Sequence, residues 1–191
     1  GGHHRFDREL VEFTLSAKAP EGWHLVSQGN GSSRDASGMA MVCVSHDLGV
    51  IARCDLRDGE VEWLYNYASS ASGEFLNSQL RREGTSPLIA GDKVIVAPRD
   101  HSGVMALNRV TGELLWEDYL VPSEQIIGTA GNALVLRGGG QLTALDLGSG
   151  KEIWNRTFAD NGDINAIVSG AQVIVVAGGK LLRVDATNGA T

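Results

Sequence analysis

Two short pairs of polar residues carry the side chains best suited to chemistry in this sequence. His46 is followed by Asp47, and Asp100 precedes His101. A histidine beside a carboxylate can serve in acid–base catalysis or bind a metal ion. The pairs stand in separate segments, and no G-x-S-x-G elbow or C-x-x-C pair accompanies them. We therefore predict no catalytic, cofactor-binding or metal-ligating residue, and we interpret both pairs as solvated loop residues.

The composition excludes several classes of protein. The chain has 191 residues, with 16 Lys and Arg against 23 Asp and Glu, for a net charge of −7. This charge argues against general nucleic-acid binding. Apolar runs such as residues 173–177 are too short to span a membrane. The 25 glycines, nearly twice the usual share, predict many turns and argue against a helical bundle.

The two cysteines leave the redox compartment open. Cys43 and Cys54 stand eleven residues apart and cannot form a zinc site by themselves. A disulfide is possible if they lie on neighbouring strands, but we favour two small buried apolar side chains.

A repeat organises the rest of the chain. Four segments share the order Asp or Asn, three residues, Gly, three residues, Trp, although the last segment stops before any Trp. The side chain of Asp or Asn can accept hydrogen bonds from the backbone ahead of it, and Gly can adopt a positive φ at the end of the turn. The Trp can fill the space between neighbouring sheets. The repeat residues are Asp55, Gly59, Trp63, Asn108, Gly112, Trp116, Asp146, Gly150, Trp154, Asp185 and Gly189.

The spacing of the repeat predicts an all-β fold. The turn glycines stand 53, 38 and 39 residues apart, and alternating apolar segments between them predict four short strands in each period. This arithmetic is that of a β-propeller with about four four-stranded antiparallel blades, within a larger propeller of up to eight blades. We expect residues 1–22 to form an N-terminal segment with a spare outer strand, and residues 23–191 to form the blades.

Three ways of closing the ring remain open at this point. The chain could form a small four-bladed ring, two chains could form an eight-bladed ring as a homodimer, or the chain could belong to a longer propeller. We favour the longer propeller, in which the remaining blades would complete the ring. Pairing of a spare first strand with the last blade would remove exposed strand edges.

The repeat resembles that of a known family. Residues 144–154, of the form A-L-D-x-x-x-G-x-x-x-W, are similar to the repeat of the quinoprotein-like (PQQ-type) β-propellers, and residues 85–96 look like the inner strand pair of that family. The resemblance covers residues 38–191. The family includes PQQ-dependent alcohol dehydrogenases and a periplasmic scaffold lipoprotein of outer-membrane protein assembly, so the resemblance favours the cell envelope.

The resemblance also separates two functions. The dehydrogenases of this family hold the quinone against a disulfide of adjacent cysteines, and they use a catalytic Asp with Glu and Asn ligands for calcium. This chain has no adjacent cysteines and no position that matches those residues. We therefore predict a non-catalytic binding or scaffold module without a cofactor. The alternative is a fragment of a PQQ-dependent dehydrogenase that binds PQQ with calcium, and a third option is the sensor domain of a larger regulatory protein.

One loop face is the candidate binding surface. In a propeller, the loops between the second and third strands share a face with the connections between blades, and binding residues concentrate on loops. We predict that six side chains on this face meet a protein partner or a small ligand: His46, Asp47, Arg99, Asp100, His101 and Arg137.

Overall fold

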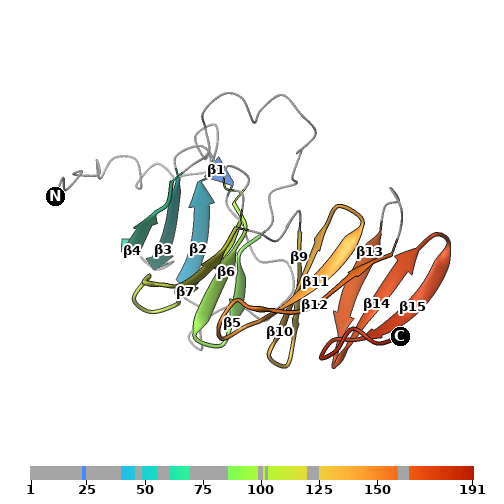
Figure 1. Cartoon of the computed structure of the whole chain (residues 1–191). Coiled ribbons are helices and arrows are strands. Elements are labelled where there is room, and N and C mark those ends of the chain that lie inside the picture. The colour runs from blue at the N-terminus through green and yellow to red at the C-terminus, as the bar shows by residue number, and fades with distance from the viewer. Residues whose placement is uncertain are drawn as a thin grey trace.

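The computed structural model describes residues 23–24, 40–45, 49–55, 61–68, 86–98, 101, 103–119, 125–158 and 164–191. Regular structure in these residues consists of strands (Figure 1). The strands are β1 (Trp23–His24), β2 (Ala40–Ser45), β3 (Val50–Asp55), β4 (Val61–Asn66), β5 (Leu88–Ala90), β6 (Lys93–Val96), β7 (Val104–Asn108), β8 (Leu114–Asp118), β9 (Gln125–Ala130), β10 (Ala133–Gly138), β11 (Gln141–Asp146), β12 (Glu152–Thr157), β13 (Asn165–Ser169), β14 (Gln172–Ala177) and β15 (Lys180–Asp185).

The strands form consecutive antiparallel sheets in chain order. Sheet 1 contains β1–β4, sheet 2 contains β5–β8, sheet 3 contains β9–β12 and sheet 4 contains β13–β15. The sheets follow one another side by side, and the first strands of sheets 2, 3 and 4 are neighbours (Figure 1). This is the blade arrangement of a β-propeller, so the predicted all-β fold is confirmed. The expected outer strand within residues 1–22 lies outside the described residues.

Glycines make the tight turns between the first and second strands. Gly91, Gly131 and Gly170 have φ values of 62°, 58° and 61°. Each stands in a two-residue hairpin loop, between Ala90 and Lys93 in sheet 2 for example. Such loops require positive φ angles that match the twist of the paired strands. The high glycine content therefore reflects the hairpin structure.

The turn between the third and fourth strands is held by the side chain that opens it. Oδ1 of Asp146 accepts a hydrogen bond of 2.8 Å from the Ser149 amide, and Oδ1 of Asp185 accepts one of 2.8 Å from the Thr187 amide. Asn108 does the same in sheet 2, where its Oδ1 accepts from the Val110 amide at 2.8 Å. The predicted turn chemistry is confirmed at these three positions. Gly59 of the first turn lies outside the described residues.

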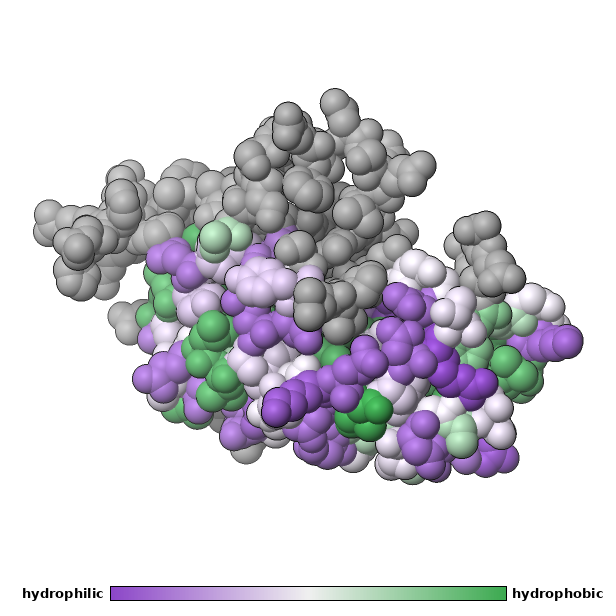
Figure 2. All heavy atoms as spheres, in the orientation of Figure 1, coloured by the Kyte–Doolittle hydropathy of each residue, from purple (hydrophilic) through white to green (hydrophobic). Residues whose placement is uncertain are grey.

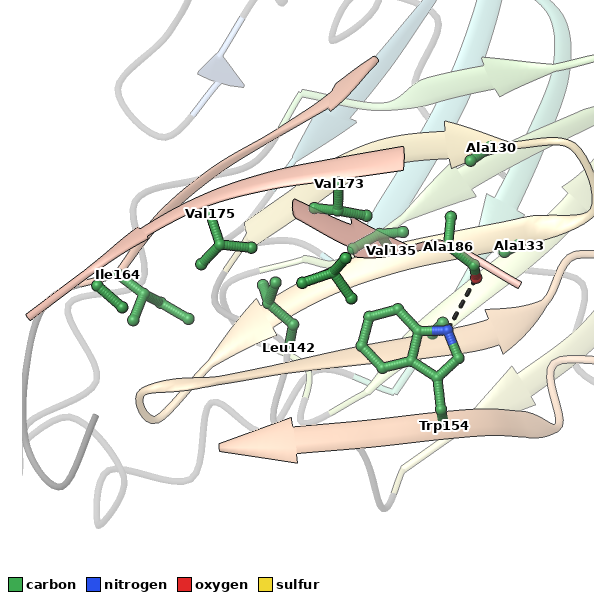
Figure 3. Close-up of a cluster of buried hydrophobic side chains, with 12 residues drawn as sticks. Ala130, Ala133, Val135, Leu142, Trp154, Ile164, Val173, Val175 and Ala186 are labelled. Atoms are coloured by element: carbon green, nitrogen blue, oxygen red, sulfur yellow. Dashed lines mark hydrogen bonds between the residues drawn. The ribbon is translucent and has the colours of Figure 1, made fainter. Parts of the chain in front are cut away.

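Each of the three repeat tryptophans joins its own sheet to the turn of the next. Nε1 of Trp63 donates to the Arg109 carbonyl at 3.0 Å, and Nε1 of Trp116 donates to the Leu147 carbonyl at 3.0 Å. Nε1 of Trp154 donates to the Ala186 carbonyl at 2.8 Å (Figure 3). The three indoles are 7–9% exposed. The prediction that they wedge between sheets is confirmed.

The turn glycines leave room for these indoles. A Cβ on Gly112 would lie 2.6 Å from the Trp63 ring, and one on Gly150 would lie 2.6 Å from the Trp116 ring. At Gly189 the corresponding distance to Trp154 is 3.0 Å. The glycine therefore serves two needs, a positive φ of 72–73° and a surface flat enough for an aromatic ring.

The core lies between the sheets. Val135 and Leu142 of sheet 3 pack with Val173 and Val175 of sheet 4 around Trp154 (Figure 3). Similar aliphatic clusters fill the space between sheets 1 and 2 and between sheets 2 and 3. Burial of this apolar surface on both faces of a sheet is the main stabilising term. The face of a sheet toward the next sheet is called the forward face, and the opposite one the backward face.

The two cysteines lie on neighbouring strands, which was the condition stated for a disulfide between them. Cys43 of β2 pairs with Ala52 of β3, and Cys54 of β3 pairs with Met41. The two cysteines are therefore not opposite one another in the strand register.

Replacement of Trp116 tests the wedge. Trp116→Ala empties a buried site between sheets 2 and 3 and removes the bond to Leu147, so we expect a loss of about 3–5 kcal/mol in the free energy of unfolding. Chemical denaturation measures it. Val110→Ala, at a side chain that is 67% exposed, is the control and should change stability little. Equal stability of Trp116→Ala and wild type would refute the wedge.

A pair of glycine variants separates steric contact from backbone strain. Gly150→Ala places a methyl group against Trp116, whereas Gly131→Ala in the same sheet meets nothing within 4 Å. Both residues need positive φ, which costs an alanine about 1–2 kcal/mol. We expect Gly150→Ala to lose about 1–3 kcal/mol more, because the ring must move. Thermal denaturation compares them, and similar losses would contradict the ring contact.

The aspartate turns predict an acid-dependent loss of stability. The hydrogen bonds from Ser149 to Asp146 and from Thr187 to Asp185 hold the pKa of each carboxyl below its usual value. A depressed pKa stabilises the fold above the unfolded-state pKa, and that contribution is lost as the pH falls through the folded-state value.

The matched variant carries Asp146→Asn and Asp185→Asn, since Asn108 shows that asparagine fits this turn. We expect the melting temperature of wild type to fall more steeply than that of the variant between about pH 5 and about pH 2. Parallel pH profiles would show that the two carboxylates contribute nothing.

Candidate partner-binding face

The candidate face consists of the loops at the end of the sheets opposite to the Asp–Gly turns. Consecutive hairpins of an antiparallel sheet alternate between its two ends, so the loops between second and third strands share one end. His101 and Arg137 of the six predicted residues are described. His46, Asp47, Arg99 and Asp100 lie outside the described residues, so their place on this face stays a prediction.

His101 is buried at the junction of sheets 1 and 2, where it is 4% exposed. Its Nε2 lies 2.7 Å from Oε1 of Glu117 on β8. Its Nδ1 lies 3.4 Å from the carbonyl oxygen of Ala68, which follows β4. The imidazole therefore bridges the β6–β7 loop, the outer strand of sheet 2 and the end of sheet 1.

Aromatic rings surround the same imidazole. The Tyr67 ring meets His101 edge-on with centroids 5.5 Å apart, and the Tyr119 ring is tilted against it at 5.1 Å. A histidine enclosed in this way acts as a link between sheets. The prediction that His101 is a solvated loop residue is therefore wrong, because its side chain is buried.

The Glu117 carboxylate contributes to a raised pKa of two neighbouring tyrosines. A hydrogen bond from Tyr119 to Glu117, with burial and the negative charge of that carboxylate, raises the pKa of the Tyr119 phenol above its usual value. Burial, followed by the charge of Glu117, raises the pKa of Tyr65. The raised pKa favours the protonated phenol, which can donate a hydrogen bond.

Arg137 joins sheets 3 and 4 at the same end of the molecule. Its Nη1 donates to the carbonyl oxygen of Ile164 at 2.7 Å, directly before β13. The guanidinium therefore fixes the start of the first strand of sheet 4. His101 and Arg137 belong to different sheet junctions, so among the described residues they support the loop face at two separate places.

Four residues of this site were not singled out by the sequence analysis. Tyr65 and Tyr67 follow Trp63 at intervals of two residues along β4 and beyond, and Glu117 and Tyr119 follow the same interval at the end of β8. Residues two apart in a strand share a face. That alternation was the available signal, but it does not say which loop residue the face will meet.

The dehydrogenase alternative requires a calcium site. Within the part of the chain that the structure describes, no group of three or more His, Cys, Asp or Glu side chains is arranged to hold a metal ion. Calcium requires six to eight oxygen ligands, most of them from such side chains or from carbonyls. The geometry defines a repeat propeller in which contacts between sheets hold the loop ends.

Within the same described residues, no helix is long and apolar enough to cross a membrane.

This class of protein is the PQQ-type β-propeller, and comparison with known proteins gives the family. The family described as outer membrane protein assembly factor BamB matches residues 12–160 and 101–191, and the chain belongs to it. The assembly factor BamB of Alkalilimnicola ehrlichii is 30% identical over an alignment of 124 residues that covers 58% of this chain and 32% of that protein.

Two solved structures share the fold. BamB from Moraxella catarrhalis has a TM-score of 0.59 and 21% identity, over 82% of this chain and 49% of that one. The quinohemoprotein alcohol dehydrogenase ADHIIG from Pseudomonas putida HK5 has a TM-score of 0.55 and 12% identity, over 80% of this chain and 32% of that one. The chain therefore spans about a third of the curated relative and about half of the solved BamB chain.

Replacement of Glu117 tests the buried link. Glu117→Ala removes the partner of an imidazole that is 3% exposed in its side chain, so we expect a loss on the order of 3 kcal/mol in the free energy of unfolding. Glu152→Ala, on an exposed residue at the start of β12, is the control and should change stability little. A double-mutant cycle with His101→Gln measures the coupling, and additive losses would exclude a direct interaction.

Proposed function

We propose that this chain is part of a non-catalytic propeller that binds a protein partner in the cell envelope, during the assembly of outer-membrane proteins. The observation that carries the proposal is its membership of the BamB family, over both halves of the chain. Its relatives are named as assembly factors. The likeness to an alcohol dehydrogenase, at 12% identity, concerns the fold alone.

The geometry supports a role in binding rather than in chemistry. Two of the six predicted residues are described, and both make contacts within the chain. His101 contacts Glu117 of its own sheet and the Ala68 carbonyl at the end of sheet 1, and Arg137 donates to the Ile164 carbonyl before sheet 4. Such contacts make the loop ends rigid, and a rigid surface loses less conformational entropy when a partner binds. The envelope location is supported by the names of the relatives.

A complementation experiment tests the proposed function. A bacterial strain that lacks the full-length gene should contain less assembled outer-membrane protein, and the wild-type gene should restore the amount. We expect a gene with His46→Ala, Asp47→Ala, Arg99→Ala and Asp100→Ala to restore less than half. The control carries Lys151→Ala and Glu152→Ala, exposed residues at the opposite end of the sheets, and should restore it fully. An unchanged amount of outer-membrane protein in the deletion strain would refute the proposal.

A ligand titration separates this function from that of a dehydrogenase. The full-length protein is mixed with PQQ and calcium while its absorbance and melting temperature are measured. We expect no change that saturates with ligand concentration. A saturable rise in melting temperature would establish specific binding and favour the dehydrogenase alternative.

A further inference from the structure

The outer strand of sheet 2 carries exposed apolar side chains along its open edge. Among the described residues, β8 pairs with β7 and has no strand on its other side. Leu114 and Leu115 of β8 are 40% and 43% exposed. Tyr119, directly after the strand, is 56% exposed, and Val110, in the turn before it, is 67% exposed. Hydrophobic surface, drawn green, lies among hydrophilic residues over sheets 1 and 2 in the left half of the view (Figure 2). An edge strand offers unpaired backbone groups, so β8 presents these together with apolar side chains.

The fold does not require apolar residues at these positions. Three of the four have a polar residue or a glycine at the corresponding position of sheet 3, counted from the repeat Trp: Gly148 for Val110, Glu152 for Leu114 and Thr157 for Tyr119. Leu115 alone has an apolar counterpart, Ile153, and both are the extra residue of a β-bulge. The two sheets make the same turn and the same bulge. The apolar character of β8 therefore points to binding, not to folding.

The charge of this edge is also specific to sheet 2. Residues 110–119 contain three acidic residues, Glu113, Glu117 and Asp118, and no basic residue. The corresponding residues 148–157 of sheet 3 contain one acidic and two basic residues. Arg109, directly before the acidic segment, interacts with Asp92 of the β5–β6 turn. An apolar edge with an excess of negative charge complements a segment that carries aliphatic and basic side chains.

Glu117 supplies a carboxylate beside aromatic rings near the loop end of this edge. It pairs with Met105 of β7, which packs in the cluster between sheets 1 and 2, so Glu117 lies on the backward face. Its side chain is 17% exposed. The Tyr119 hydroxyl donates a hydrogen bond to this carboxylate, and Tyr65 of β4 lies close enough to interact with its charge. Aromatic rings and carboxylates both attract cations, so this group suits an ammonium or guanidinium.

We propose that the open edge of β8 binds an extended segment of a partner protein that carries aliphatic side chains on both sides of one basic residue. The backbone of the segment pairs with β8 beyond the bulge. Its aliphatic side chains contact Leu114 and Leu115, and its basic side chain reaches Glu117 beside Tyr119. This binding goes beyond the proposed function, which was tested on the loop face, so either proposal can fail without the other.

Peptide binding tests the edge. The probe is a fluorescent nine-residue peptide that alternates leucine with threonine and has a central lysine, and its anisotropy is measured with the full-length protein. We expect saturable binding, and binding at least tenfold weaker when glutamate replaces the lysine. Leu115→Asp should weaken binding of the lysine peptide at least tenfold. Ile153→Asp, at the same bulge position of sheet 3 and 41% exposed, is the control and should leave binding unchanged. Both variants should melt within a few degrees of wild type.

Several outcomes would overturn the proposal: no binding of the lysine peptide, equal binding of the two peptides, or equal effects of the two aspartate variants. Light scattering without peptide should give the mass of one polypeptide. A dimer that Leu115→Asp dissociates would assign the edge to a second copy of the chain instead.

Replacement of Tyr119 tests the place of the basic side chain. Tyr119→Leu keeps an apolar side chain but removes the aromatic ring and its hydroxyl. We expect it to weaken binding of the lysine peptide about twofold to fivefold. A peptide with norleucine in place of the lysine has no charge, so its binding should not change. Equal weakening of both peptides would refute a cation beside Tyr119.

Discussion

The contact between an indole and the turn of the following sheet is the interaction on which this structure depends. A four-stranded sheet alone exposes both apolar faces, so each sheet needs neighbours on both sides. Trp63, Trp116 and Trp154 set the distance and angle between neighbours, because the ring lies on a glycine and its N–H is bonded to a turn carbonyl. The aliphatic clusters then fill the space that the rings define.

The two ends of the sheets are held by different kinds of contact. At one end, Asp and Asn side chains close short turns whose carbonyls receive the indoles. At the other end, individual polar contacts hold the strand ends and loops, and the contacts of His101 with Glu117 and of Arg137 with Ile164 are examples. The first set of contacts recurs at each of the three described junctions between sheets, so it specifies the fold. The second differs from sheet to sheet, so it can give the loop face an individual surface.

Much of the fold could be predicted because its signals are local. The hairpin glycines, the Asp-to-Gly turn and the alternation of apolar residues act within a few positions of one another, and they placed the strands to within a few residues. The candidate site was harder. His101 was expected in solvent, and its burial depends on Glu117 and the end of β4, which are distant in sequence. No local pattern reports such a meeting of two sheets.

The sequence by itself determined the repeat, the turn chemistry and the identity of the wedge residues, because each follows from the conformational preferences of single residues at fixed spacing. Only the tertiary structure decided which carbonyl each indole meets, which loop residues are buried and which sheet face is left open. These depend on the packing of one sheet on another. The difference between Leu142 and Leu181 shows it, since the same residue type at the same repeat position is buried in one sheet and exposed in the next.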